Sequence, residues 1–281
     1  MGIYTDRKSL LIALSPLRQK NTIGFVPTMG ALHMGHLSLV KQALGENNYV
    51  VVSIFINPTQ FDNPSDLKKY PRTLNEDIEL LSRLEGNILI FTPNATDLYE
   101  GPIVSKKYSF GNIENEMEGR HRKGHFDGVG TVVNLLLRAV NPAKAYFGEK
   151  DFQQLQIIRK LVVMEKLPVK IVGCPIVREN NELAMSSRNK RLSLEQFEEA
   201  SLISKTLKEV KLNFEKMSIS KLNEIVTERF LKNNLLKLEY FEIANEKNLR
   251  TARRKRKSNH YRAFIAVYAG EVRLIDNMPL N

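Results

Sequence analysis

The segment Val50–Ile56 constrains the fold more than any other part of this chain. It reads Val-Val-Val-Ser-Ile-Phe-Ile, which is an almost continuous run of apolar, strand-forming residues. A strand with one face in water alternates apolar and polar residues, whereas a strand inside a parallel sheet is buried on both faces and is apolar throughout. The segment therefore predicts a central strand of a parallel sheet that helices cover on both sides.

Other short apolar runs precede and follow this one, and they alternate with helical patterns up to about residue 185. The runs predict further strands at 23–26, 88–91, 145–147 and 169–172. The predicted helices are one beginning near Leu37, an exposed helix over 75–84, a buried helix over 131–140 and a helix over 151–163 that Asp151 caps. This alternation predicts an α/β domain with a doubly wound, Rossmann-like parallel sheet, whose ligands bind beyond the carboxyl ends of the strands.

The pattern changes after residue 189. Two amphipathic helices are expected over 193–211 and 218–232, and strands over 238–244, 262–268 and 272–275, with a hairpin at 269–271. We expect two domains, residues 1–188 and a smaller α+β domain of residues 189–281.

Composition restricts the environment and the partners. Cys174 is the only cysteine among 281 residues, which fits a reducing compartment, and no apolar run reaches membrane-spanning length. We see no signal peptide and expect a cytoplasmic protein without a membrane partner. The net charge is +11, and the run Arg253–Lys257 is the sharpest basic cluster. This run could attract nucleic acid, steer an anionic substrate or be a solvated loop; nucleic acid is disfavoured because no aromatic residues interleave the run.

The motif His33-Met34-Gly35-His36 follows the strand at 23–26 and the turn Pro27–Ala31, where a helix begins. Unpaired N–H groups and the helix dipole favour an anion there, and glycine lets phosphate oxygens approach the backbone. The histidines could also be paired metal ligands or polar residues at a helix start. Zinc is the weakest of these readings, because residues 23–45 contain no Cys, Asp or Glu.

Three further segments carry polar groups suited to ligand binding. Asn57 and Gln60 follow the strand at 50–56, where neutral amides can bind a hydroxyl or a carboxylate, although Asn-Pro could simply form a capped turn. Gly148-Glu149-Lys150-Asp151 resembles a second anion site, with Lys150 as a mobile positive charge, or is an exposed turn. Met185-Ser186-Ser187-Arg188 offers hydroxyl groups and a guanidinium to outer phosphates. The basic loop 118–126 is either a phosphate contact or a surface loop.

In this order, the segments resemble the pantothenate synthetase (pantoate–β-alanine ligase) family. The resemblance runs through the stretches 27–36, 55–61, 70–72, 125–129, 147–154, 185–189 and 273–277. The His-Met-Gly-His and Met-Ser-Ser-Arg pair is also similar to the two ATP motifs of class I aminoacyl-tRNA synthetases. The resemblance implies ATP-dependent joining of pantoate and β-alanine through a pantoyl adenylate, giving pantothenate, AMP and pyrophosphate, with Mg²⁺ arriving on ATP and a homodimer as the assembly.

The resemblance also implies roles for individual residues. His33, His36, Lys150 and Arg188 would be catalytic, and no protein side chains would bind a metal directly. The pantoate and β-alanine site would comprise Met29, Asn57, Gln60, Tyr70, Arg122 and Gln154, with Phe147 packing on the substrate. The ATP site would comprise Met29, Gly30, Ala31, Leu32, His33, Met34, Gly35, His36, Gly148, Glu149, Lys150, Asp151, Val177, Met185, Ser186, Ser187 and Arg188.

This chain departs from the family pattern at three places. Asn181 and Glu182 stand where Asp-Gly is usual, Lys123 stands where proline is frequent, and Arg253–Lys257 is unusually basic. Two other functions remain open from the sequence: a nucleotidyltransferase that makes a dinucleotide or CDP-linked product, and an RNA-binding protein that uses the basic C-terminal part.

Overall fold

The computed structural model describes all 281 residues, and the contacts between residues divide them into two compact units. Unit 1 comprises Met1–Glu114, Arg122–Glu149 and Gln154–Pro175. Unit 2 comprises Asn115–His121, Lys150–Gln153 and Ile176–Asn281. Its main segment thus begins 13 residues before position 189, where the sequence pattern changes. Hydrogen bonds from Arg178 to Asp276 account for this earlier start.

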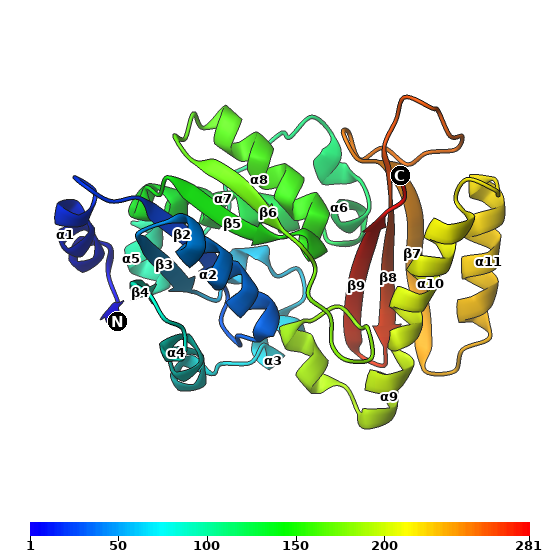
Figure 1. The fold of residues 1–281 in the computed structure, drawn as a ribbon, viewed down its shortest axis with the longest axis horizontal. Helices are drawn as coiled ribbons and strands as arrows, with labels where there is room; N and C mark the ends of the chain where they lie inside the picture. The colour runs from blue at the N-terminus through cyan, green and yellow to red at the C-terminus, as the bar shows by residue number, and fades with distance from the viewer. The chain divides into compact units, whose positions relative to one another are not determined.

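Unit 1 contains a six-stranded, fully parallel sheet with the order β1-β4-β3-β2-β5-β6 (Figure 1). The strands are β1 (Gly2–Tyr4), β2 (Ile23–Thr28), β3 (Tyr49–Ile54), β4 (Ile88–Phe91), β5 (Lys144–Gly148) and β6 (Lys170–Cys174). The helices that connect them are α1 (Arg7–Leu17), α2 (Met34–Glu46), α3 (Pro64–Lys69), α4 (Leu74–Ser82), α5 (Ala95–Tyr99), α7 (His125–Val140) and α8 (Phe152–Met164). Short 3₁₀ turns lie at η1 (Pro58–Gln60), η2 (Ile113–Asn115) and η3 (Glu149–Asp151). This topology confirms the predicted doubly wound α/β fold.

Apolar residues on both faces of the sheet hold unit 1 together. Val50 and Val52 belong to a buried cluster with residues of α2 and α4. Val51 lies between them and points to the opposite face, because successive strand residues alternate sides, and it is also fully buried. The prediction from the apolar run Val50–Ile56 is therefore confirmed, with the strand itself ending at Ile54.

The register of the sheet brings three chain segments to the same edge. Thr28, the last residue of β2, pairs with Ile54, the last residue of β3, and Gly148 pairs with Cys174 at the end of β6. The segments that follow β2, β3 and β5 therefore all leave the sheet at its carboxyl edge, which is where parallel α/β sheets bind ligands.

Unit 2 contains an antiparallel sheet of β7 (Leu236–Asn245), β8 (Tyr261–Ala269) and β9 (Val272–Pro279). Its helices are α6 (Glu118–His121), α9 (Leu194–Glu199), α10 (Ser201–Asn213) and α11 (Ile219–Leu231), with a 3₁₀ turn η4 (Ser187–Arg191). Helices α10 and α11 pack on this sheet through one apolar cluster (Figure 1). The predicted hairpin is confirmed: Gly270 adopts φ +59° between Ala269 and Val272, which pair with each other.

Several sequence predictions need local correction. Pro27 and Thr28 belong to β2 rather than to a turn, and the helix expected from Asp151 begins one residue later, after the 3₁₀ turn that Asp151 ends. The expected helix 193–211 is divided into α9 and α10 at Ala200. The helix expected to be exposed over 75–84 is α4, and it buries Asp77 and Leu81. β1 and α1 had no prediction, because three residues of strand and a helix containing Pro16 give weak patterns.

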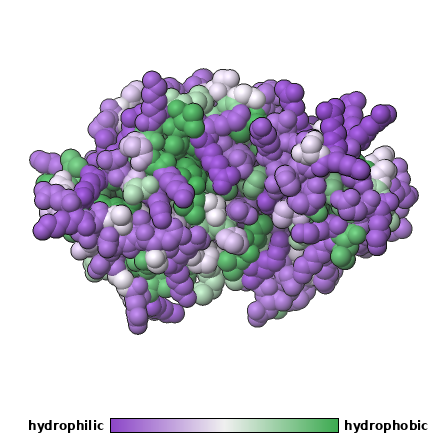
Figure 2. Space-filling view, turned by 45° about the horizontal axis from the view of Figure 1, so that its top comes forward, coloured by the Kyte–Doolittle hydropathy of each residue, from purple (hydrophilic) through white to green (hydrophobic).

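The view in Figure 2 shows a mainly hydrophilic face with smaller hydrophobic areas. None of the helices combines the length and the apolar character that crossing a membrane requires.

Candidate functional site

The turn between β2 and α2 has a left-handed backbone conformation that is held by a residue distant in the sequence. Gly30 and Ala31 have φ angles of +80° and +50°, a region that is unfavourable for alanine. Asp77 of α4, which is 1% exposed, holds this turn by accepting hydrogen bonds from the Ala31 N–H at 2.9 Å and the Leu32 N–H at 2.8 Å. The buried carboxylate therefore fixes the approach to the His-Met-Gly-His motif.

The two histidines of the motif lie together at the start of α2. His33 is the N-cap residue, and its Nδ1 accepts the Gly35 N–H at 3.1 Å. Because Nδ1 is the acceptor, the neutral ring carries its proton on Nε2 and can donate there. The His33 and His36 rings have centroids 4.1 Å apart. The helix start thus combines imidazole donors with the positive end of a 13-residue helix, an arrangement suited to an anion.

Met29, Asn57 and Gln60 form a second cluster in unit 1, brought together by the ends of β2 and β3. The Gln60 amide contacts Met29 Sδ at 2.8 Å, and Asn57 Nδ2 donates to Gln60 Oε1 at 3.2 Å. Asn57 is 1% exposed and accepts a 2.6 Å hydrogen bond from the Tyr99 hydroxyl. Burial raises the pKa of Tyr99, so this hydroxyl keeps its proton and can donate. No sequence pattern pointed to Tyr99, which lies 42 residues from Asn57.

A neighbouring histidine fixes the backbone of Gln60. His125 Nδ1 donates to the Gln60 carbonyl oxygen at 2.8 Å, and Arg122 donates to His125 Nε2 at 3.1 Å. Arg122 also lies 3.5 Å from Asp62. Arg122, which was expected to bind substrate, therefore lies close to Gln60, and His125 links the two by hydrogen bonds. His125 had no individual role in the expectations from the sequence.

Helix α7 approaches Gln60 very closely. A Cβ atom at Gly128 would lie 2.3 Å from the Thr59 carbonyl oxygen and 2.6 Å from Gln60 Cα. The Gly128 carbonyl also accepts a hydrogen bond from Asn57 Nδ2 at 3.2 Å. Glycine is therefore required where α7 supports the turn that carries Gln60.

Unit 2 contains Lys150 and the Met-Ser-Ser-Arg segment, together with the residues that hold them. Asn277 Nδ2 donates to the Lys150 carbonyl oxygen at 2.8 Å, and Asn277 Oδ1 accepts from Arg262 at 2.6 Å. Arg262 in turn lies over the Phe152 ring, 3.8 Å from its centroid. These contacts fix the backbone at Lys150, and its side-chain nitrogen lies 3.5 Å from a carboxylate oxygen of Asp151.

Asp276 holds the segment that leads into Met185–Arg188. Arg178 binds both oxygens of Asp276, at 2.7 and 3.1 Å, and donates to the Glu182 carbonyl at 3.0 Å. Burial raises the pKa of Asp276, while its pairing with Arg178 opposes that rise. Ser186 Oγ accepts the Arg188 N–H at 3.2 Å and so starts η4. The stretch Arg273–Asn277 thus anchors Lys150 and the segment Ser186–Arg188. This stretch belongs to the family resemblance, but the sequence assigned no role to its residues.

Glu182 adopts φ +75° where the family pattern has glycine. The left-handed turn is therefore kept without glycine, and the Glu182 carboxylate pairs with Lys208 at 3.0 Å, which holds its pKa below the usual value.

The basic loop 118–126 is partly committed to structural contacts. Arg120 pairs with Glu242, and His121 stacks on Tyr240 with ring centroids 5.0 Å apart. Buried Glu118 accepts from Arg273 at 2.8 Å and from the Tyr240 hydroxyl at 2.7 Å. A buried carboxylate therefore ties this segment to β7 and β9.

The other expected site residues lie as follows. Tyr70 is buried and packs edge-on against Phe61, with ring centroids 5.7 Å apart. Val177 accepts the Met185 N–H at 3.0 Å. Gly148, Glu149 and Gln154 lie at or just after the end of β5, and Ser187 is buried in η4. The structure contains no group of three or more His, Cys, Asp or Glu side chains arranged to hold a metal ion.

Fold and site together define an α/β protein whose helix start at the carboxyl edge of the parallel sheet has the geometry that suits an anion. A sequence model of the pantoate-beta-alanine ligase family matches residues 3–279. The chain therefore belongs to the pantoate-beta-alanine ligase family and is a ligase.

Similar proteins match over the whole length. The pantothenate synthetases of Flavobacterium psychrophilum and Christiangramia forsetii are 52% and 51% identical, each over 100% of both chains. The crystal structure of pantothenate synthetase from Thermus thermophilus has a TM-score of 0.91 at 36% identity, covering 100% of this chain and 99% of that one. The Francisella tularensis pantoate-beta-alanine ligase, complexed with beta-gamma ATP and beta-alanine, has a TM-score of 0.83 at 38% identity, with 100% and 98% covered.

Proposed function

We propose that this chain joins pantoate and β-alanine at the expense of ATP, giving pantothenate, AMP and pyrophosphate. One pantoate carboxylate oxygen attacks the α-phosphorus, and pyrophosphate leaves with the electrons of the broken P–O bond. The amine of β-alanine then attacks the carbonyl carbon of the pantoyl adenylate. It loses a proton, and AMP leaves with the carboxylate oxygen that had attacked phosphorus.

The observation that carries this proposal is the paired imidazoles at the start of α2, 4.1 Å apart, in a chain that matches the family over residues 3–279. Negative charge grows on the phosphate oxygens during the first step, and donors already in place stabilise that charge without reorganising. His36 and His33 are proposed to donate to the α- and β-phosphates. The turn Met29–Leu32, which Asp77 holds, is proposed to border the nucleotide together with Met34 and Gly35.

Residues of unit 2 are also proposed to bind phosphates of ATP. Lys150 supplies a mobile charge from a fixed backbone, while Ser186, Ser187 and Arg188 supply hydroxyl and guanidinium donors. Gly148, Glu149, Asp151, Val177 and Met185 are proposed to line the nucleotide site. We further propose that residues 1–188 bind ATP and pantoate, and that residues 189–281 act as a lid.

Gln60 is proposed to bind the pantoate hydroxyl and carboxylate together with Gln154. The support for this role is that Asn57, His125 and Gly128 fix the Gln60 amide and its backbone. Met29 offers an apolar contact beside the same amide. Phe147, Tyr70 and Arg122 complete the proposed pantoate and β-alanine site.

Mg²⁺ is proposed to arrive with ATP. A hard cation that keeps several of its waters needs few protein ligands when phosphate oxygens are available. The structure has no group of three or more His, Cys, Asp or Glu side chains that could hold a metal ion by itself. When bound, the ion would neutralise phosphate charge. We also propose a homodimer, which light scattering can test, and a cytoplasmic location, supported by the single buried cysteine.

Exchange of labelled pyrophosphate into ATP tests the proposal. Exchange should require pantoate and proceed without β-alanine, and His36→Ala should slow it by roughly 10². Gln60→Ala should instead raise the pantoate concentration needed for half-saturation. Exchange without pantoate would favour a nucleotidyltransferase, and near-normal exchange by His36→Ala would remove this histidine from the mechanism.

A further inference from the structure

The run Arg253–Lys257 lies in the loop between β7 and β8, and its residues divide into two kinds. Lys255 is half-buried: its Nζ donates to the carbonyls of Phe214 and Met217 at the turn between α10 and α11, and it lies 5.0 Å from the Phe214 ring centroid. Lys255 therefore ties the loop to the helices. The arginines on either side of it are exposed and have no such partner.

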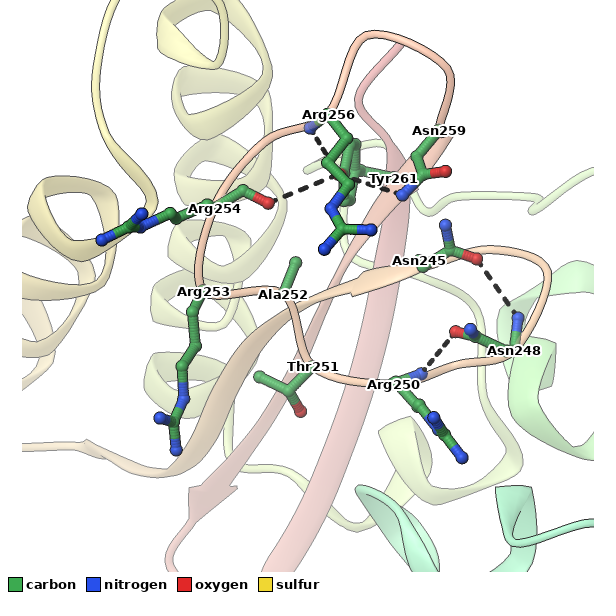
Figure 3. Close-up of a pocket in the computed structure, with 10 residues that line it drawn as sticks. All are labelled: Asn245, Asn248, Arg250, Thr251, Ala252, Arg253, Arg254, Arg256, Asn259 and Tyr261. Carbon is green, nitrogen blue, oxygen red and sulfur yellow. Dashed lines mark hydrogen bonds between the residues drawn. The ribbon is translucent and has the colours of Figure 1, made fainter.

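Arg250, Arg253, Arg254 and Arg256 line one cavity of about 460 Å³ on this loop (Figure 3). No carboxylate lies within ion-pair distance of any of the four. Elsewhere in unit 2 the arginines that line the sheet are paired, as Arg178 is with Asp276 at 2.7 Å. Four uncompensated cations within seven residues repel one another, which disfavours the folded loop unless an anion binds there.

The loop is nevertheless well fixed. The buried Tyr261 hydroxyl accepts the Arg256 N–H at 2.8 Å and lies 3.4 Å from the Arg254 carbonyl oxygen. Asn281 donates to the Asn259 carbonyl at 3.0 Å and closes the far end. A fixed backbone presents the arginines at low entropic cost to a ligand.

The arginine side chains point in different directions. In Figure 3 Arg256 points into the space that the loop encloses, whereas Arg254 and Arg253 project away from the loop, to the left and downward. One phosphate ion could not reach all of these guanidinium groups, but successive groups along a chain could.

We propose that the loop 250–256 of unit 2 is a binding site for a linear chain of phosphates, namely inorganic polyphosphate. One guanidinium group can bind two oxygens of a phosphate with parallel hydrogen bonds, which a lysine cannot do. Arginine occupies four of these seven positions, as a phosphate site would require. The cavity lining has one aromatic residue, Tyr261, which is 2% exposed, so no ring is available for stacking bases. This feature favours a phosphate chain without bases over single-stranded RNA. None of the residues that line the cavity is among the proposed catalytic residues.

Titration calorimetry on the full chain tests the proposal, with phosphate, tripolyphosphate, long-chain polyphosphate and single-stranded RNA as probes. Long-chain polyphosphate should bind more tightly than tripolyphosphate, and single phosphate should bind least. The variant R253Q/R254Q/R256Q should bind long-chain polyphosphate roughly tenfold more weakly or worse, because it loses three charge-assisted contacts. It should retain pantoate-dependent pyrophosphate exchange.

The control variant K211Q/K216Q/K232Q removes the same charge from exposed positions outside the loop. It should bind polyphosphate as the unaltered chain does. Equal weakening of polyphosphate binding in both variants would show that binding depends only on net charge, and it would overturn the proposal. Tighter binding of RNA than of polyphosphate would also overturn it. If the triple variant does not fold, R253Q and R254Q singly should each weaken binding several-fold, and unchanged binding in both would refute the site.

Discussion

Replacing Gly128 by alanine tests whether α7 positions Gln60. The added Cβ would lie 2.3 Å from the Thr59 carbonyl oxygen and 2.6 Å from Gln60 Cα, and both obstacles are backbone atoms. Restoring ordinary contact requires α7 and the turn η1 to separate by about 1 Å. Alanine gains about 1 kcal/mol over glycine inside a helix, while overpacking of this kind costs about 1–3 kcal/mol. The variant should therefore fold with a small net loss of stability.

The main effect should appear in pantoate kinetics. A displacement of about 1 Å in a substrate-positioning group can lower the rate up to roughly 10²-fold, so kcat/KM for pantoate should fall by about 10- to 100-fold. Saturation with ATP should change little, because the histidines proposed to bind phosphate lie at the start of α2, whereas the substitution displaces α7 and η1.

Gly130→Ala is the matched control for Gly128→Ala. Its Cβ would meet side chains, 3.0 Å from Tyr108 and 3.1 Å from Phe110, on the same helix but away from Gln60. It should alter stability without altering the pantoate dependence. Normal pantoate kinetics in a folded Gly128→Ala protein would refute the positioning role of α7.

Three other predictions concern single interactions. Asp77→Ala should lower the free energy of unfolding by about 2–4 kcal/mol, because two buried N–H groups of the turn after β2 lose their acceptor; an unchanged denaturant midpoint would contradict this. Glu182→Gly should raise the melting temperature slightly, since relief of a φ of +75° outweighs the exposed pair with Lys208; a lower melting temperature would show that the pair dominates. Hydrogen bonding to Lys144 lowers the pKa of Glu46 from 4.5 to about 2. The ionised Glu46 carboxylate therefore contributes to stability above pH 4.5, and this contribution is lost as the pH falls toward 2. The stability difference between the unaltered chain and Glu46→Gln should shrink over that interval, and a constant difference would refute the pairing.

The sequence predicted those features that local pattern determines. The apolar run through Val50 indicated a central parallel strand, and the turn at Gly270 indicated the β8–β9 hairpin. The His33 motif was placed at a helix start because it lies between a strand pattern and a helical spacing. Each of these features depends on residues a few positions apart.

The supporting residues were missed because their partners are distant in the chain. Asp77 looked like one more polar residue of an exposed helix, since helical spacing cannot reveal a carboxylate that reaches the turn 46 residues earlier. Asn277 meets the Lys150 carbonyl across 127 residues. Gly128 carries no side chain from which a close approach could be recognised.

Transfer of an oxygen atom from pantoate to AMP is the most direct test of the proposed chemistry. If the pantoate carboxylate attacks the α-phosphorus, pantoate labelled with ¹⁸O in its carboxylate must deliver one labelled oxygen to each AMP. Mass spectrometry should find that label in AMP and none in pyrophosphate. Unlabelled AMP, or label in pyrophosphate, would contradict attack at the α-phosphorus and with it the role given to His33 and His36.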